Sequence, residues 1–157
     1  MSAPRQAGDW WKAARQQIDT LDARLLLHTV TGISHAALLS HPETLLTPAE
    51  QERLAHLTQR RAAGEPLAYL TNEAGFYGRN FAVAAGQVLI PRPETEELVD
   101  RALTLLAQLA AAQTPNILKA LDLGTGSGVI PVSLALEYRG SIPLAMTAAE
   151  ISPAALA

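Results

Sequence analysis

The sequence predicts an α/β protein in which a helical N-terminal region precedes a β-hairpin and the start of a parallel sheet. Three observations support this fold class. Apolar residues recur at helical spacing from about Gly8 to Leu70. Aromatic and apolar residues then flank turn-forming residues between 75 and 90, which is typical of one hairpin or of two. Finally, the apolar run 117–123 leads through alternating glycines into another apolar segment, as in a strand–loop–helix unit.

The helices of the N-terminal region have predictable beginnings and ends. A first helix is expected to break near Asp19, a second to end at Gly32, and a short third to be capped by Ser34. The clearest helix start is Thr47-Pro48-Ala49-Glu50, which supplies an N-cap, a proline at the first helical position and the glutamate of a capping box. This fourth helix is expected to end at Gly64.

No catalytic grouping is recognisable in this region. The Arg60-Arg61 pair is interpreted as a solvated helix end that the helix dipole favours. Up to Leu70, seven basic residues balance seven acidic ones, which indicates a recognition module for a protein partner. Four histidines show neither the spacing of metal ligands nor an accompanying acid pair: His28, His35, His41 and His56.

The segment after Gly75 changes character. Residues 76–81 and 81–90 each carry hairpin signals, so one or two hairpins are expected. Pro91 and Pro93 stiffen the backbone that follows. Pro93 is expected to begin a helix whose first turn holds three glutamates and which ends near Thr114-Pro115.

The run 117–123 is interpreted as a buried parallel strand, and residues 129–136 as a helix packed on it. The loop between them would bring backbone N–H groups and a helix N-terminus to one point, which suits a nucleotide-like cofactor. Val129 stands where a dinucleotide fingerprint has its third glycine, and no lysine follows as in a Walker A loop. The loop glycines are Gly124, Gly126 and Gly128.

Two acidic residues accompany this loop. Asp122 lies two residues before the first loop glycine, and Glu150 follows the next apolar stretch, 142–149. A carboxylate at the end of that second strand can accept hydrogen bonds from both hydroxyls of a ribose. The alternative interpretation is a glycine turn in an unrelated α/β unit, with Glu150 merely ending a strand.

The composition excludes several other classes of function. The net charge of −3 argues against a broad nucleic-acid-binding surface, and the absence of cysteine excludes disulfides, thiolate metal sites and a cysteine nucleophile. The N-terminus lacks the pattern of a signal peptide, and the apolar stretch 103–112 is too short to span a bilayer. A cytoplasmic protein is therefore expected, with neither a membrane nor a nucleic-acid partner.

The pattern Asp-x-Gly-x-Gly-x-Gly at 122–128 resembles the first motif of class I S-adenosylmethionine-dependent methyltransferases. Over most of its length the chain resembles the N-terminal part of the release factor glutamine methyltransferases, the PrmC/HemK family. The specific segment is Pro91-Arg92-Pro93-Glu94-Thr95-Glu96, because related ribosomal-protein glutamine methyltransferases differ after the first proline. The other matching segments are 22–27, 30–32, 60–61, 64–70, 76–78 and 121–128.

This resemblance implies a helical substrate-recognition domain at 1–72, a β-hairpin linker at 73–93 and the N-terminal part of a Rossmann-like domain at 94–157. The implied activity is N5-methylation of the glutamine in the Gly-Gly-Gln loop of peptide chain release factors. The family's Asn-Pro-Pro-Tyr motif, which holds the target amide, is absent from these residues. The chain is therefore expected to be a monomeric fragment that is inactive by itself and holds no catalytic residue.

The resemblance also implies that S-adenosylmethionine is the cofactor. Its binding residues would be Asp122, Gly124, Thr125, Gly126, Ser127, Gly128 and Glu150, where the family usually has Asp at the last position. The linker residues on the substrate side would be Arg92, Pro93 and Glu94, and no metal is implied.

Three other functions remain compatible with the sequence. A sibling methyltransferase acting on a ribosomal protein or an adenine base would share the glycine loop. A non-catalytic module would bind a translation factor through its helices and hold no cofactor. A nicotinamide-dependent oxidoreductase is disfavoured by Val129.

Overall fold

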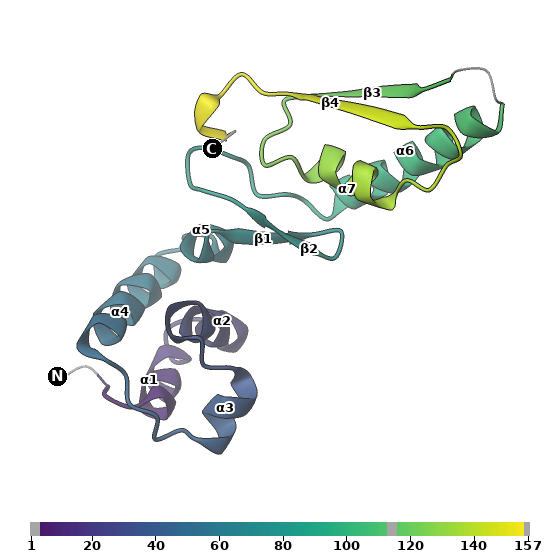
Figure 1. Cartoon of the computed structure of the whole chain (residues 1–157). Helices are drawn as coiled ribbons and strands as arrows, with labels where there is room; N and C mark the ends of the chain where they lie inside the picture. The colour runs from purple at the N-terminus through teal and green to yellow at the C-terminus, as the bar shows by residue number, and fades with distance from the viewer. Residues whose placement is uncertain (1–3, 113–115, 156–157) are drawn as a thin grey trace. The chain divides into compact units, whose positions relative to one another are not determined.

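A computed structural model describes residues 4–112 and 116–155 (Figure 1). The α/β class is confirmed, since helices and two small sheets are both present. The chain divides into two compact units, residues 1–71 and 72–157, which are described separately. No helix within the described ranges is long and apolar enough to cross a membrane.

Within its described residues, 4–71, the first unit consists of helices together with one isolated antiparallel bridge between Gln6 and Leu45. The predicted caps are present: Ser34 caps the third helix, and Thr47 and Glu50 form both halves of a capping box. Asp19, where a break was expected, caps the second helix, and the fourth helix ends at Ala62, two residues before the predicted Gly64. Gly32 ends the second helix with a φ of 73°, a left-handed conformation that favours glycine. The helices are α1 (Ala7–Ala14), α2 (Thr20–Thr31), α3 (His35–Ser40), α4 (Pro48–Ala62) and α5 (Leu67–Thr71).

One hydrophobic core holds these helices together. Its residues come from every helix of the unit, which explains why the apolar positions recur at helical spacing. The largest completely enclosed side chains are Leu26, Leu27 and Leu54, and Trp10 is only 4 % exposed. The first unit therefore has a core of its own.

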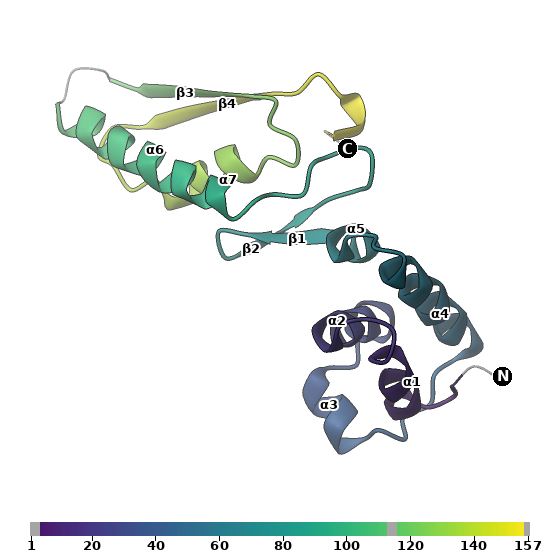
Figure 2. The same cartoon turned by 180° about the vertical axis from the view of Figure 1, so that it is seen from behind.

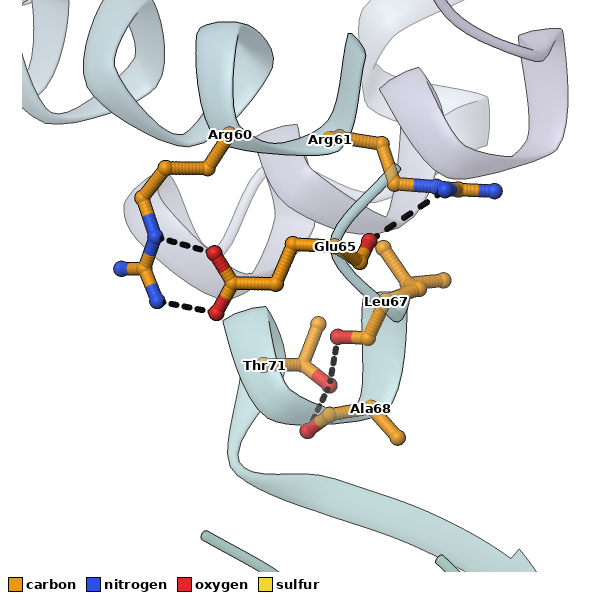
Figure 3. Close-up of polar contacts among 6 residues, drawn as sticks. All are labelled: Arg60, Arg61, Glu65, Leu67, Ala68 and Thr71. Atoms are coloured by element: carbon orange, nitrogen blue, oxygen red, sulfur yellow. Dashed lines mark hydrogen bonds and ion pairs between the residues drawn. The ribbon is translucent and has the colours of Figure 1, made fainter. Parts of the chain in front are cut away.

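Arg60 and Arg61 lie in the last turn of α4 and stay partly exposed, as interpreted from the sequence, but both side chains also have specific partners (Figure 3). Arg60 makes a two-nitrogen ion pair with Glu65, in which Nε donates to Oε2 at 2.7 Å. Arg61 donates from Nε to Asp22 of α2 at 2.6 Å and from Nη1 to the Glu65 carbonyl at 3.2 Å. The two arginines thus fasten the end of α4 to α2 and to the turn before α5.

The second unit begins with a hairpin of β1 (Glu73–Phe76) and β2 (Arg79–Ala82). Tyr77 and Gly78 have φ of 51° and 73°, the combination that a two-residue type I′ turn requires. Of the two alternatives that the sequence left open, one hairpin or two, the structure contains one, because residues 84–93 contain no strand. Val83 N–H instead donates to the Asn72 carbonyl, and a turn follows in which Gln87 N–H donates to the Ala84 carbonyl.

Hydrogen bonds connect this hairpin to two helices, α6 (Glu94–Ala111) and α7 (Val129–Glu137). Tyr77 donates its N–H to Glu96 at 2.7 Å and its hydroxyl to Asp100 at 2.5 Å. Arg79 forms an ion pair with Glu137 at the end of α7. The hairpin is therefore an integral part of the second unit. The predicted end of α6 at Thr114-Pro115 lies outside the described residues.

The strands β3 (Leu118–Leu123) and β4 (Leu144–Ala149) pair in parallel without offset, so that Asp122 faces Ala148. They are joined through α7, which gives a strand–helix–strand unit. Both α6 and α7 lie on the same side of this sheet, as Figures 1 and 2 show from opposite directions. A short 3-10 turn, η1 (Pro153–Ala155), follows β4.

The prediction that this parallel strand is buried holds for one face only. The even-numbered side chains of β3 and β4 point toward the helices, and Leu118 is buried in the core of this unit. The odd-numbered face is uncovered, and Leu121 and Leu123 are 61 % and 74 % exposed. A strand of a parallel sheet normally has both faces covered, and here the helices supply only one layer.

Candidate functional site

The site begins at the glycine loop between β3 and α7. Gly124, Gly126 and Gly128 all have positive φ, at 75°, 54° and 75°, which side chains other than glycine rarely adopt. A Cβ added to Gly124 or Gly126 would meet no heavy atom within 4 Å, so the loop faces open space there. The backbone is thus accessible to a ligand at the positions where the sequence predicted it.

Backbone hydrogen bonds fix this loop against the neighbouring strand. The Ala149 carbonyl accepts from Gly124 N–H at 2.8 Å and from Thr125 N–H at 3.1 Å. Gly128 N–H donates to the Thr125 carbonyl at 2.9 Å, which closes the turn into α7. Because β3 and β4 end level with each other, the loop after β3 and the residue after β4 lie together.

Glu150 occupies this meeting point. Its Oε2 accepts from Gly126 N–H at 2.8 Å, and its Oε1 accepts from the N–H groups of Ile151 and Ser152 at 2.9 and 3.0 Å. The N–H groups of Ser152 and then Gly126 lower the pKa of Glu150 below its usual value, against an opposing effect of partial burial. The carboxylate is consequently an anion at neutral pH.

Two buried oxygen atoms beside the loop lack a hydrogen-bond partner among the described residues. They are Oδ2 of Asp122 and Oγ1 of Thr125, and Thr125 is only 8 % exposed. Leaving a buried hydroxyl or carboxylate oxygen unpaired is unfavourable. Both atoms lie beneath the loop and have almost no accessible surface, and only Thr125 belongs to a residue that also lines the pocket.

A pocket of about 760 Å³ lies against the loop. Thr125, Ser127 and the loop glycines 126 and 128 form one wall, and the segment after the hairpin forms another. Most other lining side chains are apolar, from α7, β4 and η1: Pro131, Val132, Ala135, Met146, Ala148, Ala154 and Ala155. An amphipathic molecule with polar groups toward the loop fits this distribution.

The structure places the predicted site residues in two groups. Asp122, the five residues of the loop and Glu150 lie around the ends of β3 and β4, and of these residues Thr125, Gly126, Ser127 and Gly128 line the pocket, whereas the other three do not. The linker residues Arg92, Pro93 and Glu94 do not line the pocket and instead begin α6, where the Arg92 carbonyl accepts from Thr95 N–H.

The sequence interpretation missed the second wall of the pocket. It consists of Asn72 and residues from the segment 82–88, among them Gln87. This segment was expected to belong to the region of one hairpin or two, and its apolar residues give no signal that distinguishes a pocket wall from a hairpin. Among its lining residues, Asn72 has an unusual backbone conformation, with a φ of 59°.

These features fit S-adenosylmethionine as a ligand. Its ribose hydroxyls and amino-acid end require hydrogen-bonding partners, and the loop residues 125–128 that line the pocket can offer them, with the carboxylates of Asp122 and Glu150 beside the loop but outside the pocket lining. Its adenine requires apolar surface, which the pocket provides. No group of three or more potential metal ligands occurs in the part of the chain that the structure describes.

Comparisons with known proteins give a consistent result. Residues 5–71 match the family model described as the PrmC N-terminal domain. The chain is 46 % identical to the release factor glutamine methyltransferase of Pasteurella multocida over 114 residues, 72 % of this chain and 38 % of that protein. It is 45 % identical to the protein of the same name from Bordetella pertussis over 137 residues, 87 % of this chain and 47 % of that protein. For the Koribacter versatilis protein of this name, the identity is 41 % over 145 residues, 92 % of this chain and 48 % of that protein. The chain thus spans less than half the length of these relatives.

Proposed function

Because residues 5–71 match the PrmC N-terminal domain model and the chain is similar to part of the release factor glutamine methyltransferases, we propose that it contributes to S-adenosylmethionine-dependent methylation of release factors. The methylated group would be the glutamine side chain of their Gly-Gly-Gln loop. The residues after 93 would form the start of a Rossmann-like methyltransferase domain, and the helical unit would help to engage the release factor.

One observation of the structure supports the cofactor most directly. An open glycine loop, a buried hydroxyl without a partner and a carboxylate meet at the carboxyl ends of two parallel strands. Ligands of open α/β sheets bind at this edge. The Val at 129 removes the third glycine of a dinucleotide fingerprint, which favours S-adenosylmethionine over a nicotinamide cofactor.

S-adenosylmethionine would supply an electrophilic methyl group on its sulfonium. The residues of this chain would bind and orient that molecule rather than transfer a proton. The glycine loop would receive the cofactor against its backbone, and Thr125 would donate its hydroxyl to a polar group. Asp122 would lie near the amino-acid end and Glu150 near the ribose. Arg92, Pro93 and Glu94 would lie on the substrate side.

The test is calorimetric titration of this chain with S-adenosylmethionine and, for comparison, with NAD. We expect Thr125→Val to weaken S-adenosylmethionine binding by about two- to tenfold, because it removes one neutral hydrogen bond while keeping the side-chain shape. The matched control is Ser133→Ala in α7, which also deletes a buried hydroxyl without a partner but lies outside the pocket.

The outcome has two informative parts. Equal affinities of the Thr125→Val and Ser133→Ala variants would contradict the placement of the cofactor at this loop. Binding of NAD in preference to S-adenosylmethionine would contradict the proposed reaction class.

A further inference from the structure

Tyr77 occupies an unusual position in the turn between β1 and β2. Its φ of 51° lies in the left-handed region, which two-residue turns of this type normally fill with asparagine, aspartate or glycine. A tyrosine in this conformation costs free energy and persists only where other contacts hold it. A turn of Tyr77 and Gly78 therefore fixes the hairpin less strongly by itself than an Asn-Gly turn would.

Hydrogen bonds to every polar group of Tyr77 supply this hold, and two of them come from α6. The Tyr77 N–H donates to Oε1 of Glu96 at 2.7 Å, and its hydroxyl donates to Oδ1 of Asp100 at 2.5 Å. Its carbonyl accepts from Nη1 of Arg79 at 3.0 Å, and Arg79 in turn pairs with Glu137 of α7. Figures 1 and 2 show the hairpin turn beside the start of α6. The contacts of Glu96 and Asp100 with Tyr77 are called the hairpin latch below.

The hairpin latch closes the stretch of chain that forms the second wall of the pocket. Tyr77 and Glu96 lie 19 residues apart, and the wall segment 82–88 lies between them. This segment is tied to the hairpin at its start, where Val83 N–H donates to the Asn72 carbonyl at 3.1 Å, and it contains no strand beyond residue 83. Closing a loop costs chain entropy, which the hydrogen bonds to Glu96 and Asp100 offset.

The turn also determines which hairpin residues reach the pocket. The turn type fixes the register of a hairpin, and a slip of one residue would move every side chain to the other face. In the observed register Phe81 is buried in the core of this unit, whereas Ala82 lines the pocket. Three residue steps, about 10 Å of strand, separate Phe76 at the turn from Glu73 at the far end. A shift of the turn is therefore transmitted to the wall.

We propose that Glu96 and Asp100 are positioning residues, which hold the hairpin turn and thereby keep the second wall of the pocket in place for a ligand. The proposal rests on the proposed function for the identity of that ligand, S-adenosylmethionine, whereas the closure of the wall does not. It assigns to Glu96, the last residue of the segment 91–96, a role through the hairpin rather than through contact with a ligand or substrate.

The first experiment measures hydrogen exchange by NMR at the amides of Val83 and Gln87 in the ligand-free chain. We expect Glu96→Ala to accelerate exchange at both amides by roughly tenfold, the factor that follows from losing one hydrogen bond to a charged group. Glu96→Gln keeps an oxygen acceptor on a side chain of the same length, so it is expected to restore most of the protection.

The matched control is Glu97→Ala, which removes the same charge from the same turn of α6 but changes an exposed side chain that pairs with Arg101. It should leave both exchange rates as they are in the wild type. Unchanged exchange in Glu96→Ala, or an equal acceleration in Glu97→Ala, would overturn the latch. The same conclusion follows if Glu96→Gln accelerates exchange as much as Glu96→Ala does.

A second experiment measures the affinity for S-adenosylmethionine by calorimetric titration. Glu96→Ala is expected to weaken binding by about three- to tenfold, because the ligand must then order the wall itself. Tyr77→Phe deletes only the hydroxyl that donates to Asp100 and should have a smaller effect in the same direction, and Glu97→Ala should have none. Wild-type affinity in Glu96→Ala would overturn the role of the latch in the pocket. If the wild type binds no S-adenosylmethionine, the proposed function fails, and exchange at Val83 and Gln87 still decides whether the latch closes the wall.

Discussion

At the scale of single residues, the ion pairs at the end of α4 have a clear structural role. Glu65 was recognised in the sequence only as part of a matching segment, yet its side chain and carbonyl receive both Arg60 and Arg61 (Figure 3). Arg60 lowers the pKa of Glu65 below its usual value, mainly through the hydrogen bonds that it donates to the carboxylate. Which residue each arginine contacts depends on where α4 ends and how the chain turns after it. Sequence spacing does not reveal it.

The Glu65 pair predicts acid sensitivity of the first unit. A carboxyl group whose pKa is lower in the folded state stabilises that state fully above its unfolded pKa, and this contribution is lost as the pH falls through the folded value. Glu65→Gln is therefore expected to reduce the fall in melting temperature between neutral pH and about pH 3. Circular dichroism measures this, with Glu52→Gln, an exposed position on α4, as the control. Equal acid profiles for the wild type and Glu65→Gln would contradict the prediction.

At the scale of elements, local chemistry predicted most helix boundaries and the order of strands. The capping box at Thr47, the glycine stop at Gly32 and the strand–loop–helix order at 118–137 all depend on neighbouring residues, so the sequence contains them. The turn signals left the number of hairpins open, and the Val83 N–H that donates to the Asn72 carbonyl after β2 is a contact that those signals do not encode. The glycine loop was predictable for the same local reason, whereas the pocket wall at 82–88 required the tertiary structure.

The capping box of α4 predicts a measurable contribution to stability. Thr47 Oγ1 accepts from Glu50 N–H at 3.2 Å, and Glu50 Oε2 accepts from Thr47 N–H at 2.7 Å. Thr47→Ala is expected to lower the free energy of unfolding by about 1 kcal/mol. Urea denaturation measures the change, and Thr47→Ser, which keeps the hydroxyl, is expected to lose less. An unchanged midpoint in Thr47→Ala would show that α4 is held by its core contacts alone.

At the scale of the whole molecule, the two units have separate cores. The buried residues of the first core all precede 71, and those of the second all follow 75. The change of residue character at Gly75 indicated a boundary in this region, but the integration of the hairpin with α6 and α7 depends on contacts such as that of Tyr77 with Asp100. Nothing in the sequence indicates that the side chains of Tyr77 and Asp100 form a hydrogen bond.

Separate cores predict that residues 1–71 fold without the rest of the chain. A fragment of this extent is expected to unfold cooperatively, because it contains the complete first core, including Trp10, Leu26 and Leu54. Tryptophan fluorescence and circular dichroism should give coincident denaturation curves, since both tryptophans lie in α1. Leu54→Ala, which leaves a cavity at a fully buried site, is the control that must destabilise the fragment. A broad transition in the unsubstituted fragment would contradict independent folding.

The uncovered face of β3 and β4 has a consequence for synthesis of the protein on the ribosome. Leu121 and Leu123 face outward, and within the described residues each of the two strands pairs only with the other. In any longer protein that contains this stretch, the same apolar face and open strand edges would emerge before later residues could cover them. Such surfaces attract other chains. We therefore expect the nascent chain to be most dependent on chaperones at the stage when β4 has left the exit tunnel.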